Sequence, residues 1–238
     1  MKRSIAIVLV PWIIFACGGE PPAKAPEATA PAAPPPKAAT KPKLNMSQEL
    51  GEIDPKKADA AVKAAHTSVT RCQTQGHQRL DFMSGEVKFF VRLGPDGAVK
   101  WAYLEDSSLG DRETEKCILQ ALRAAPWPKP EGGDAEVRNG FVLGASDARE
   151  PASWGADKIA AALGKAKAEL DKCTAGTKGS FRVTGYVEPD GKEGKFSAVG
   201  VAPPNKEGEA QVDCIVGALR SIKLPSPGSY AAKVSFSL

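Results

Sequence analysis

The five cysteines, Cys17, Cys72, Cys117, Cys173 and Cys214, are the residues of this 238-residue chain whose chemistry is most open. A cysteine serves as a nucleophile, as a metal ligand or as half of a disulfide, depending on its surroundings. Zinc sites and thioredoxin-like redox sites use C-x-x-C pairs, and the sequence contains none. We therefore expect no metal site, no cofactor and no redox centre.

A catalytic cysteine also needs a neighbouring base. His66 and His77 both lie in the first half of the chain, and the second half keeps two cysteines without any histidine. The carboxylates that recur, Asp96 and Asp190, lie in Pro-Asp-Gly turns, where Asp bonds to the backbone. No phosphate-binding glycine loop and no G-x-S-x-G serine occurs. We expect no catalytic residue and no small-molecule substrate; an envelope enzyme with a site between domains is the alternative of another class.

The chain contains an internal repeat. CILQALRAAPWPKP from Cys117 and CIVGALRSIKLPSP from Cys214 share seven of fourteen residues without a gap. Each copy also has an upstream cysteine, a Pro-Asp-Gly turn and a closing apolar strand, in the same order. This pattern indicates a tandem duplication.

Each copy contains one cysteine near the end of its first helix and one on its second helix. We predict the disulfides Cys72–Cys117 and Cys173–Cys214, because the pair recurs in both copies and because the secretion signal that the N-terminus resembles, described below, would place the chain in an oxidising compartment. The loop-closure estimate is about 4 kcal/mol for each bond. The repeat keeps the pair while it loses the histidine, which favours a structural role.

The fold class predicted for each copy is α+β, in the order helix, strand, strand, helix, strand, with a small antiparallel sheet. Apolar residues at helical spacing and strand alternation support this order. The two domains are expected at residues 46–145 and 153–238. The predicted elements are helices at 55–71, 111–125 and 156–172, and strands at 86–93, 99–105, 137–143 and 233–238.

Several side chains are expected to have structural roles. Trp127 lies between two prolines and is expected to pack over the sheet, with a ligand platform as the alternative. Arg123 and Arg220 end the second helix of each copy, where a cation complements the helix dipole. Glu113 and Glu115 are expected on a solvated helix face.

The N-terminus resembles a bacterial lipoprotein signal. Lys2 and Arg3 precede an apolar run that is too short to span a membrane, which needs about 20 residues. The run ends in Ile14-Phe15-Ala16-Cys17, which resembles a lipobox. The resemblance implies a signal peptide at residues 1–16 and lipid attachment at Cys17, through diacylglycerol and an acyl chain such as palmitate. The alternative is an ordinary signal peptide cut after Ala16.

Residues 17–45 are rich in proline and alanine, and we expect them to form a disordered linker. The absence of Asp after Cys17 implies, by the lipoprotein rule, an outer-membrane lipoprotein that faces the periplasm. The net charge of +4 is spread along the chain, so no folded segment is strongly basic. We expect no nucleic-acid binding, which needs concentrated Lys and Arg, and membrane contact only through the lipid.

The segment Gly85–Gly133 runs from a strand through Pro-Asp-Gly, a second strand and Ser-Ser-Leu to the Cys-Ile helix and a proline-bounded exit. It resembles the TonB C-terminal type of domain, most closely the C-terminal domain of AgmX/PglI-type proteins of myxobacteria. The resemblance implies a non-catalytic scaffold of an envelope assembly, linked to motility or transport. Its partners would be envelope proteins, bound by strand addition at a sheet edge. A TonB-like energy transducer that serves an outer-membrane transporter is the alternative.

Overall fold

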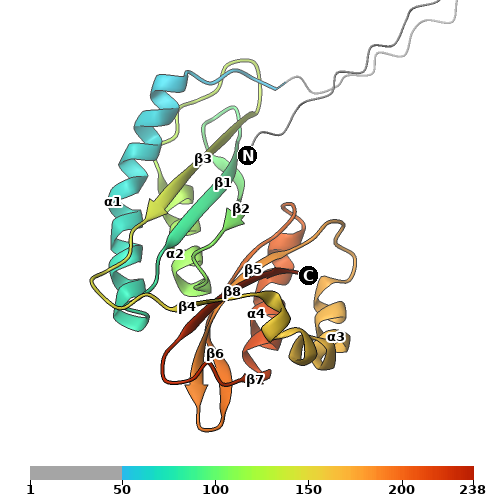
Figure 1. Ribbon diagram of the computed structural model, residues 1–238. Helices are drawn as coiled ribbons and strands as arrows, with labels where there is room; N and C mark the ends of the chain where they lie inside the picture. The colour runs from blue at the N-terminus through green and yellow to red at the C-terminus, as the bar shows by residue number, and fades with distance from the viewer. Residues whose placement is uncertain (1–49) are drawn as a thin grey trace, which may run out of the picture. The chain divides into compact units, whose positions relative to one another are not determined.

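The computed structural model describes residues 50–238 (Figure 1). The predicted signal peptide, the lipid site Cys17 and the linker at residues 17–45 lie outside the described residues. The fold is α+β, with four α-helices and two sheets, as predicted.

The first half follows the predicted order of elements, and its sheet has the strand order β2-β1-β3 with antiparallel pairing throughout. Two helices, α1 and α2, pack against one face of this sheet. The elements are α1 (Pro55–Arg79), β1 (Gly85–Leu93), β2 (Val99–Ser107), α2 (Arg112–Ala124) and β3 (Ala135–Leu143).

Helix α1 is capped by Asp54, begins at Pro55 and is longer than predicted. Asp54 accepts the Lys56 backbone N–H (2.9 Å), and Pro55 stands at the first helical position, which needs no donor. The helix continues to Arg79 because nothing in residues 72–79 breaks it; Gly76 is buried there, and a Cβ atom would clash with the side chain of Met83.

Helix α2 begins and ends as the sequence predicts. The side chain of Asp111 accepts the Thr114 N–H (3.2 Å) and caps the first turn. The helix ends at Ala124, two residues before Pro126. Trp127 follows, is 8% exposed and donates its ring N–H to the Leu122 carbonyl (2.7 Å), so its predicted packing role is confirmed.

The second half keeps the predicted order and adds two strands of three residues each, one at either edge of the sheet. The sheet has the order β4-β8-β5-β6-β7. The pairing is mainly antiparallel, as expected, and the short strand β4 pairs with β8 in parallel. The elements are β4 (Ala152–Trp154), α3 (Ala160–Thr174), β5 (Arg182–Asp190), β6 (Glu193–Ala202), α4 (Val212–Arg220), β7 (Lys223–Pro225) and β8 (Ala232–Ser237), with 3₁₀ turns η1 (Ala156–Lys158) and η2 (Gly208–Gln211).

The strand registers support the duplication. Val87 of β1 lies opposite Phe141 of β3, and Val183 of β5 lies opposite Phe236 of β8. Strands β5, β6 and β8 therefore correspond to β1, β2 and β3, and Arg138 corresponds to Lys233. The remaining strands, β4 and β7, have no counterpart in the first half.

Each sheet has its own apolar core, and the two halves also contact each other. Tyr186 of β5 is fully buried and packs against Phe82 of the first half, with ring centroids 5.2 Å apart. Its hydroxyl donates to the Ser84 carbonyl (3.3 Å), and burial raises its pKa to about 12. This contact fixes one face of β5 against the first half.

Candidate functional site

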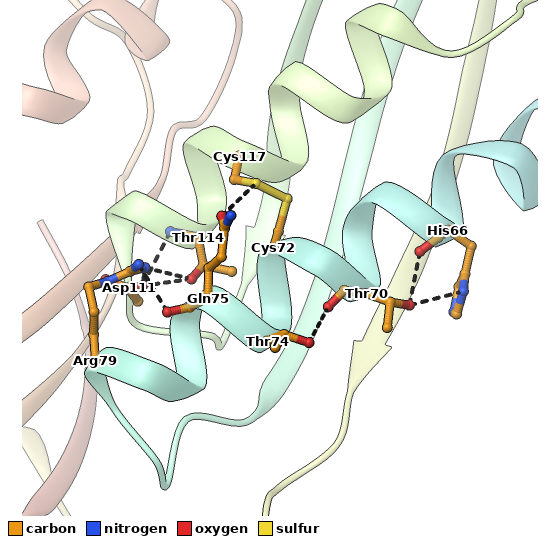
Figure 2. The surroundings of a disulfide bond; sticks show 9 residues. All are labelled: His66, Thr70, Cys72, Thr74, Gln75, Arg79, Asp111, Thr114 and Cys117. Carbon is orange, nitrogen blue, oxygen red and sulfur yellow. Dashed lines mark hydrogen bonds and ion pairs between the residues drawn. A yellow bond between two sulfur atoms is a disulfide. The ribbon is translucent and has the colours of Figure 1, made fainter.

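The four cysteines of the two copies form the two predicted disulfides. Cys72 of α1 is joined to Cys117 of α2 with a Cα–Cα distance of 5.7 Å, as Figure 2 shows. Cys173 of α3 is joined to Cys214 of α4 at 5.5 Å. Each bond ties the two helices of one half together, so none of these thiols is available as a nucleophile or ligand.

Both histidines contact other residues of the fold. His66 of α1 contacts the ring of Phe141 edge-on, with centroids 6.1 Å apart. His77 forms a hydrogen bond of 2.8 Å with the Met83 carbonyl. Among residues 50–238, no cluster of three or more His, Cys, Asp or Glu residues has the arrangement of a metal site. Within the same range, no helix has the length and apolar character needed to cross a membrane.

Glu115 corrects one prediction. It was expected on a solvated face together with Glu113, which is exposed, but Glu115 is fully buried where α2 meets β6. Its carboxylate accepts the Ser107 hydroxyl (2.6 Å) and the Val201 backbone N–H (3.1 Å). Burial raises the pKa of Glu115, and these two hydrogen bonds partly oppose that shift. A Cβ atom at Gly200 would clash with this carboxylate, so the glycine permits the contact.

A second buried charge links the halves beside it. Arg112 of α2 is 4% exposed, and its guanidinium donates to Asp213 (2.9 Å) and Glu209 (2.9 Å) of the second half. On the other side of α2, the capping carboxylate of Asp111 also accepts Arg79 of α1 (2.6 Å), which Figure 2 shows. Ion pairs on both sides thus hold the start of α2 in place. The charges of Arg112 and Asp111 therefore have a structural role.

Arg123 has a further role beyond the one expected. Its guanidinium donates to the Ala102 carbonyl of β2 (3.2 Å), so it ties α2 to the sheet as well as standing in the last turn of the helix. Most of the polar side chains discussed form hydrogen bonds or ion pairs within the fold, although Arg112 Nη1 and Glu209 Oε2 are buried without a hydrogen-bond partner.

Among the described strands, β3 pairs with β1 and has no strand on its outer edge. The Ser108 N–H donates to the Glu86 carbonyl (2.9 Å), so the even-numbered residues of β1 turn their backbone groups toward β2. The odd-numbered residues of β1 therefore bond to β3, whose register with β1 is unbroken from Ala135 to Leu143. The even-numbered residues of β3 consequently direct their N–H and C=O groups away from the sheet. These are Glu136, Arg138, Gly140 and Val142.

We call these even-numbered backbone groups the outer row of β3. At its beginning, the carbonyl of Asp134 accepts the Gly51 N–H (2.7 Å). Within residues 50–238, the backbone groups of Glu136 and Arg138 form no hydrogen bond. Val142, an apolar residue of this row, is 80% exposed. An unpaired strand of this length is a template for another strand.

The corresponding edge of the second half is occupied. The Ala152 N–H of β4 donates to the Ala231 carbonyl (2.9 Å), and β4 runs along β8 until Trp154 lies opposite Val234. Strand β7 covers the other edge of the same sheet by pairing with β6. The edge strand β2 of the first sheet lies against the second half, where Arg182 pairs with Asp106 (3.0 Å). Strands β3 and β8 correspond to each other in the two copies. Among the described residues, β8 has a strand paired along its outer edge and β3 does not.

A groove accompanies the open edge on the helix side of the sheet. It has a volume of about 410 Å³ and is lined by Val62, Lys63 and His66 of α1 together with Gly140 and Phe141 of β3. The groove is shallow and mostly apolar, with one cation and one histidine at its rim.

On the opposite face of the sheet, Arg138 lies over the ring of Phe90, 4.5 Å from its centroid. It also forms ion pairs with Glu105 (2.9 Å) and Glu136 (3.1 Å), and the first of these raises the pKa of Arg138 most. The side chains on this face are therefore held in place while the backbone of the outer row stays open.

The chain matches no family model, no curated protein and no solved structure. The candidate site accordingly rests on the geometry of β3 and its neighbours. The sequence predicted β3 as a strand, but it held no signal for which strand would form the open edge.

Proposed function

We propose that this protein is a non-catalytic binding module, which accepts an extended segment of a partner protein as an additional strand on β3. The observation that carries this proposal is the contrast between the two duplicated edges. The edge of β8 has a strand, β4, hydrogen-bonded to it, whereas within residues 50–238 the outward backbone groups of Glu136 and Arg138 on β3 have no hydrogen-bond partner.

The chemistry of such binding has two parts. Backbone hydrogen bonds to Glu136 and Arg138 supply affinity and require only an extended partner backbone. The groove lined by Val62, Lys63, His66, Gly140 and Phe141 supplies selectivity, since a side chain of the added strand points into it. The example of β4 favours a partner strand that runs parallel to β3, with a large apolar side chain opposite Asn139, where β4 has Trp154 opposite Val234.

The cellular setting of this proposal comes from the N-terminal sequence. Cleavage before Cys17 and lipidation of its thiol would hold the module at the outer membrane, facing the periplasm. The segment at residues 17–45 would separate the module from the membrane surface, as expected for a scaffold part of an envelope assembly. The resemblance to TonB C-terminal and AgmX/PglI-type domains supports a partner in motility or transport.

The edge can be tested with one pair of variants. Arg138→Pro removes the outward N–H of the outer row, while proline on an edge strand leaves the β1–β3 hydrogen bonds intact. Arg138→Ala removes the same ion pairs and the contact with Phe90 but keeps the N–H. A photo-crosslinking residue at Val142 in the native envelope should capture a defined partner in the Arg138→Ala chain and at least tenfold less of it in the Arg138→Pro chain. Equal capture by both variants would contradict strand addition at β3.

The lipid anchor has its own test. The wild-type chain should partition into the detergent phase and incorporate labelled palmitate, and Cys17→Ser should abolish both. A Cys17→Ser chain that stays in the membrane fraction with unchanged labelling would refute lipidation at this residue.

A further inference from the structure

A second groove lies in the second half, between α3, the end of α4 and β7, which Figure 1 labels. Its volume is about 670 Å³, larger than the 410 Å³ of the groove beside β3 and within the range of about 300–1,000 Å³ that is usual for ligand pockets. Leu224 of β7 is 3% exposed and lies on its floor. The other apolar residues of the floor are Ala162, Ala166, Ala218 and Ile222. We call this cavity the α3–β7 groove.

Short side chains and a disulfide give the α3–β7 groove its shape. Ala162 and Ala166 of α3 and Ala218 of α4 line it with methyl groups only, so the two helices leave space between them. The disulfide Cys173–Cys214 joins the same two helices, with Cα atoms 5.5 Å apart. The walls of the groove are therefore held in place before any ligand binds, which lowers the entropy cost of binding.

The first copy of the repeat has a large aromatic side chain where the α3–β7 groove has its floor. Trp127 and Leu224 occupy the same position of the repeat, counted from Cys117 and from Cys214. Trp127 is 8% exposed and donates to the Leu122 carbonyl (2.7 Å), so its indole ring packs into the first half. The smaller leucine leaves part of this space unfilled in the second copy. The first copy thus shows that a peptide segment carrying an indole ring fits this part of the repeat.

The rim of the α3–β7 groove carries positive charge that the first copy lacks. Three lysines from three different elements line it: Lys165 of α3, Lys192 of the turn between β5 and β6, and Lys223 of β7. At the same positions the first copy has the uncharged residues Ala64, Ala98 and Pro126. The cations therefore accompany the groove and not the repeat as such.

The carboxylates at the rim do not neutralise all of these lysines. Glu193 pairs with Lys223 (2.9 Å), and Glu169 pairs with Lys172 (2.8 Å), which does not line the groove. Within residues 50–238, Lys165 and Lys192 form no ion pair. Two ammonium groups thus stand at the rim of an apolar floor, an arrangement that is complementary to an acidic ligand with an apolar part.

We propose that the α3–β7 groove binds an acidic segment of a partner protein that carries one large aromatic side chain. The ring occupies the space above Leu224, and carboxylates on either side of it pair with Lys165 and Lys192. Large aromatic side chains in apolar pockets, with charged groups at the rim, are typical anchors of protein interfaces. The groove belongs to the second half, so this site does not depend on strand addition at β3.

Two peptides test the aromatic part of this recognition. The probes are the capped pentapeptide Asp-Glu-Trp-Glu-Asp and the same peptide with alanine in place of tryptophan. Each is added to the isotope-labelled full secreted chain carrying Cys17→Ser, and binding is measured from the NMR shifts of the Ala162, Ala218 and Leu224 amides. We expect the tryptophan peptide to bind about tenfold more tightly, because its ring is buried on the floor. Equal affinity of the two peptides would overturn the proposal, as would the absence of any shift at these amides.

Two double variants test the charged part. Lys165→Glu with Lys192→Glu reverses the charge at the rim, and we expect it to weaken binding of the tryptophan peptide about tenfold. Lys56→Glu with Lys178→Glu is the matched control, because both lysines are exposed and lie outside the groove; its affinity should stay within about twofold of the parent chain. Equal weakening by both double variants would show attraction by net charge alone and would overturn the site.

A third probe separates a peptide from a lipid. Vesicles of phosphatidylglycerol also offer anionic groups beside apolar chains. If the vesicles shift the same amides with the same dependence on Lys165 and Lys192, and the tryptophan peptide shifts none, the groove binds an anionic lipid and the proposed peptide ligand is wrong. Shifts with the tryptophan peptide and none with the vesicles are the result that we expect.

Discussion

The buried carboxyl of Glu115 offers the sharpest test of how the two halves are joined. It belongs to α2 of the first half, and it accepts hydrogen bonds from Ser107 on its own side and from Val201 on β6 of the second half. Glu115→Ala removes the acceptor for both. The Val201 N–H is then left without an acceptor in a buried position, because both Glu115 and Val201 are buried.

The expected loss can be estimated from these contacts. A buried donor without an acceptor costs about 1–3 kcal/mol. The one methylene removed from this packed site, Cγ, adds about 0.8 kcal/mol. Removing a buried carboxylate recovers part of this, so we expect Glu115→Ala to lower the free energy of unfolding by about 2 kcal/mol at neutral pH.

Glu115→Gln is the informative partner of this variant. Glutamine keeps the size and an acceptor oxygen but does not ionise. Burial raises the pKa of Glu115 in the folded protein above its unfolded value. The stability that Glu115 contributes to the fold is therefore complete below the unfolded pKa, and it is lost as pH rises through the folded pKa. The wild type should therefore lose stability relative to Glu115→Gln as pH rises, by about 1.4 kcal/mol for each unit by which the folded pKa exceeds the unfolded one.

Urea unfolding at intervals from pH 4 to pH 8 measures this difference directly. All other titrating groups are common to both proteins, so the difference between the two stability curves reports Glu115. Curves that stay parallel over this range would refute the assignment of a raised pKa. A Glu115→Ala variant as stable as the wild type would refute the role of this carboxyl in joining α2 to β6.

Two further predictions concern the disulfides and the covered edge. Replacing Cys72 and Cys117 together by alanine should lower the free energy of unfolding by about 4 kcal/mol, because the disulfide closes a loop with a sequence separation of 45 residues. Urea unfolding measures this loss, and a loss below about 1 kcal/mol would contradict the loop-closure argument. Ala152→Pro removes the N–H that β4 donates to Ala231, so it should expose the edge of β8 and cause concentration-dependent self-association in sedimentation. Ser153→Pro is the control and should not self-associate. A monomeric Ala152→Pro chain would show that β4 is not needed to protect this edge.

The features that depend on short stretches of sequence could be predicted. The order of the elements follows from apolar periodicity and from Pro-Asp-Gly turns, and Asp96 indeed accepts the Ala98 N–H (3.0 Å) in the first turn. The disulfide pairs followed from comparing the copies, because Cys72 and Cys117 recur as Cys173 and Cys214 while the histidines do not. Comparing the two copies within the chain thus identified the paired cysteines, as an alignment of relatives does for other proteins.

The features that depend on contact between halves could not be predicted. Glu115 has the spacing of a solvated helix residue when α2 is considered by itself, and only the approach of Gly200 and Val201 buries it. Strand β4 has three residues, too few for an alternation to be recognised, and its pairing with β8 is parallel. The open edge of β3 was missed for the same reason, since the order of strands in a sheet is set by packing.

The difference between the two duplicated edges has a physical consequence for assembly. A module with two open edges would join other copies end to end, since each exposed strand is a template for the next. Here the second copy has closed its larger sheet on both sides, with β4 on β8 and β7 on β6, and it lies against β2 of the first sheet. Among the described residues, the outer edge of β3 then remains without a strand paired along it. A single open edge accepts one added strand, so the closed edges of the second half would prevent copies from joining end to end.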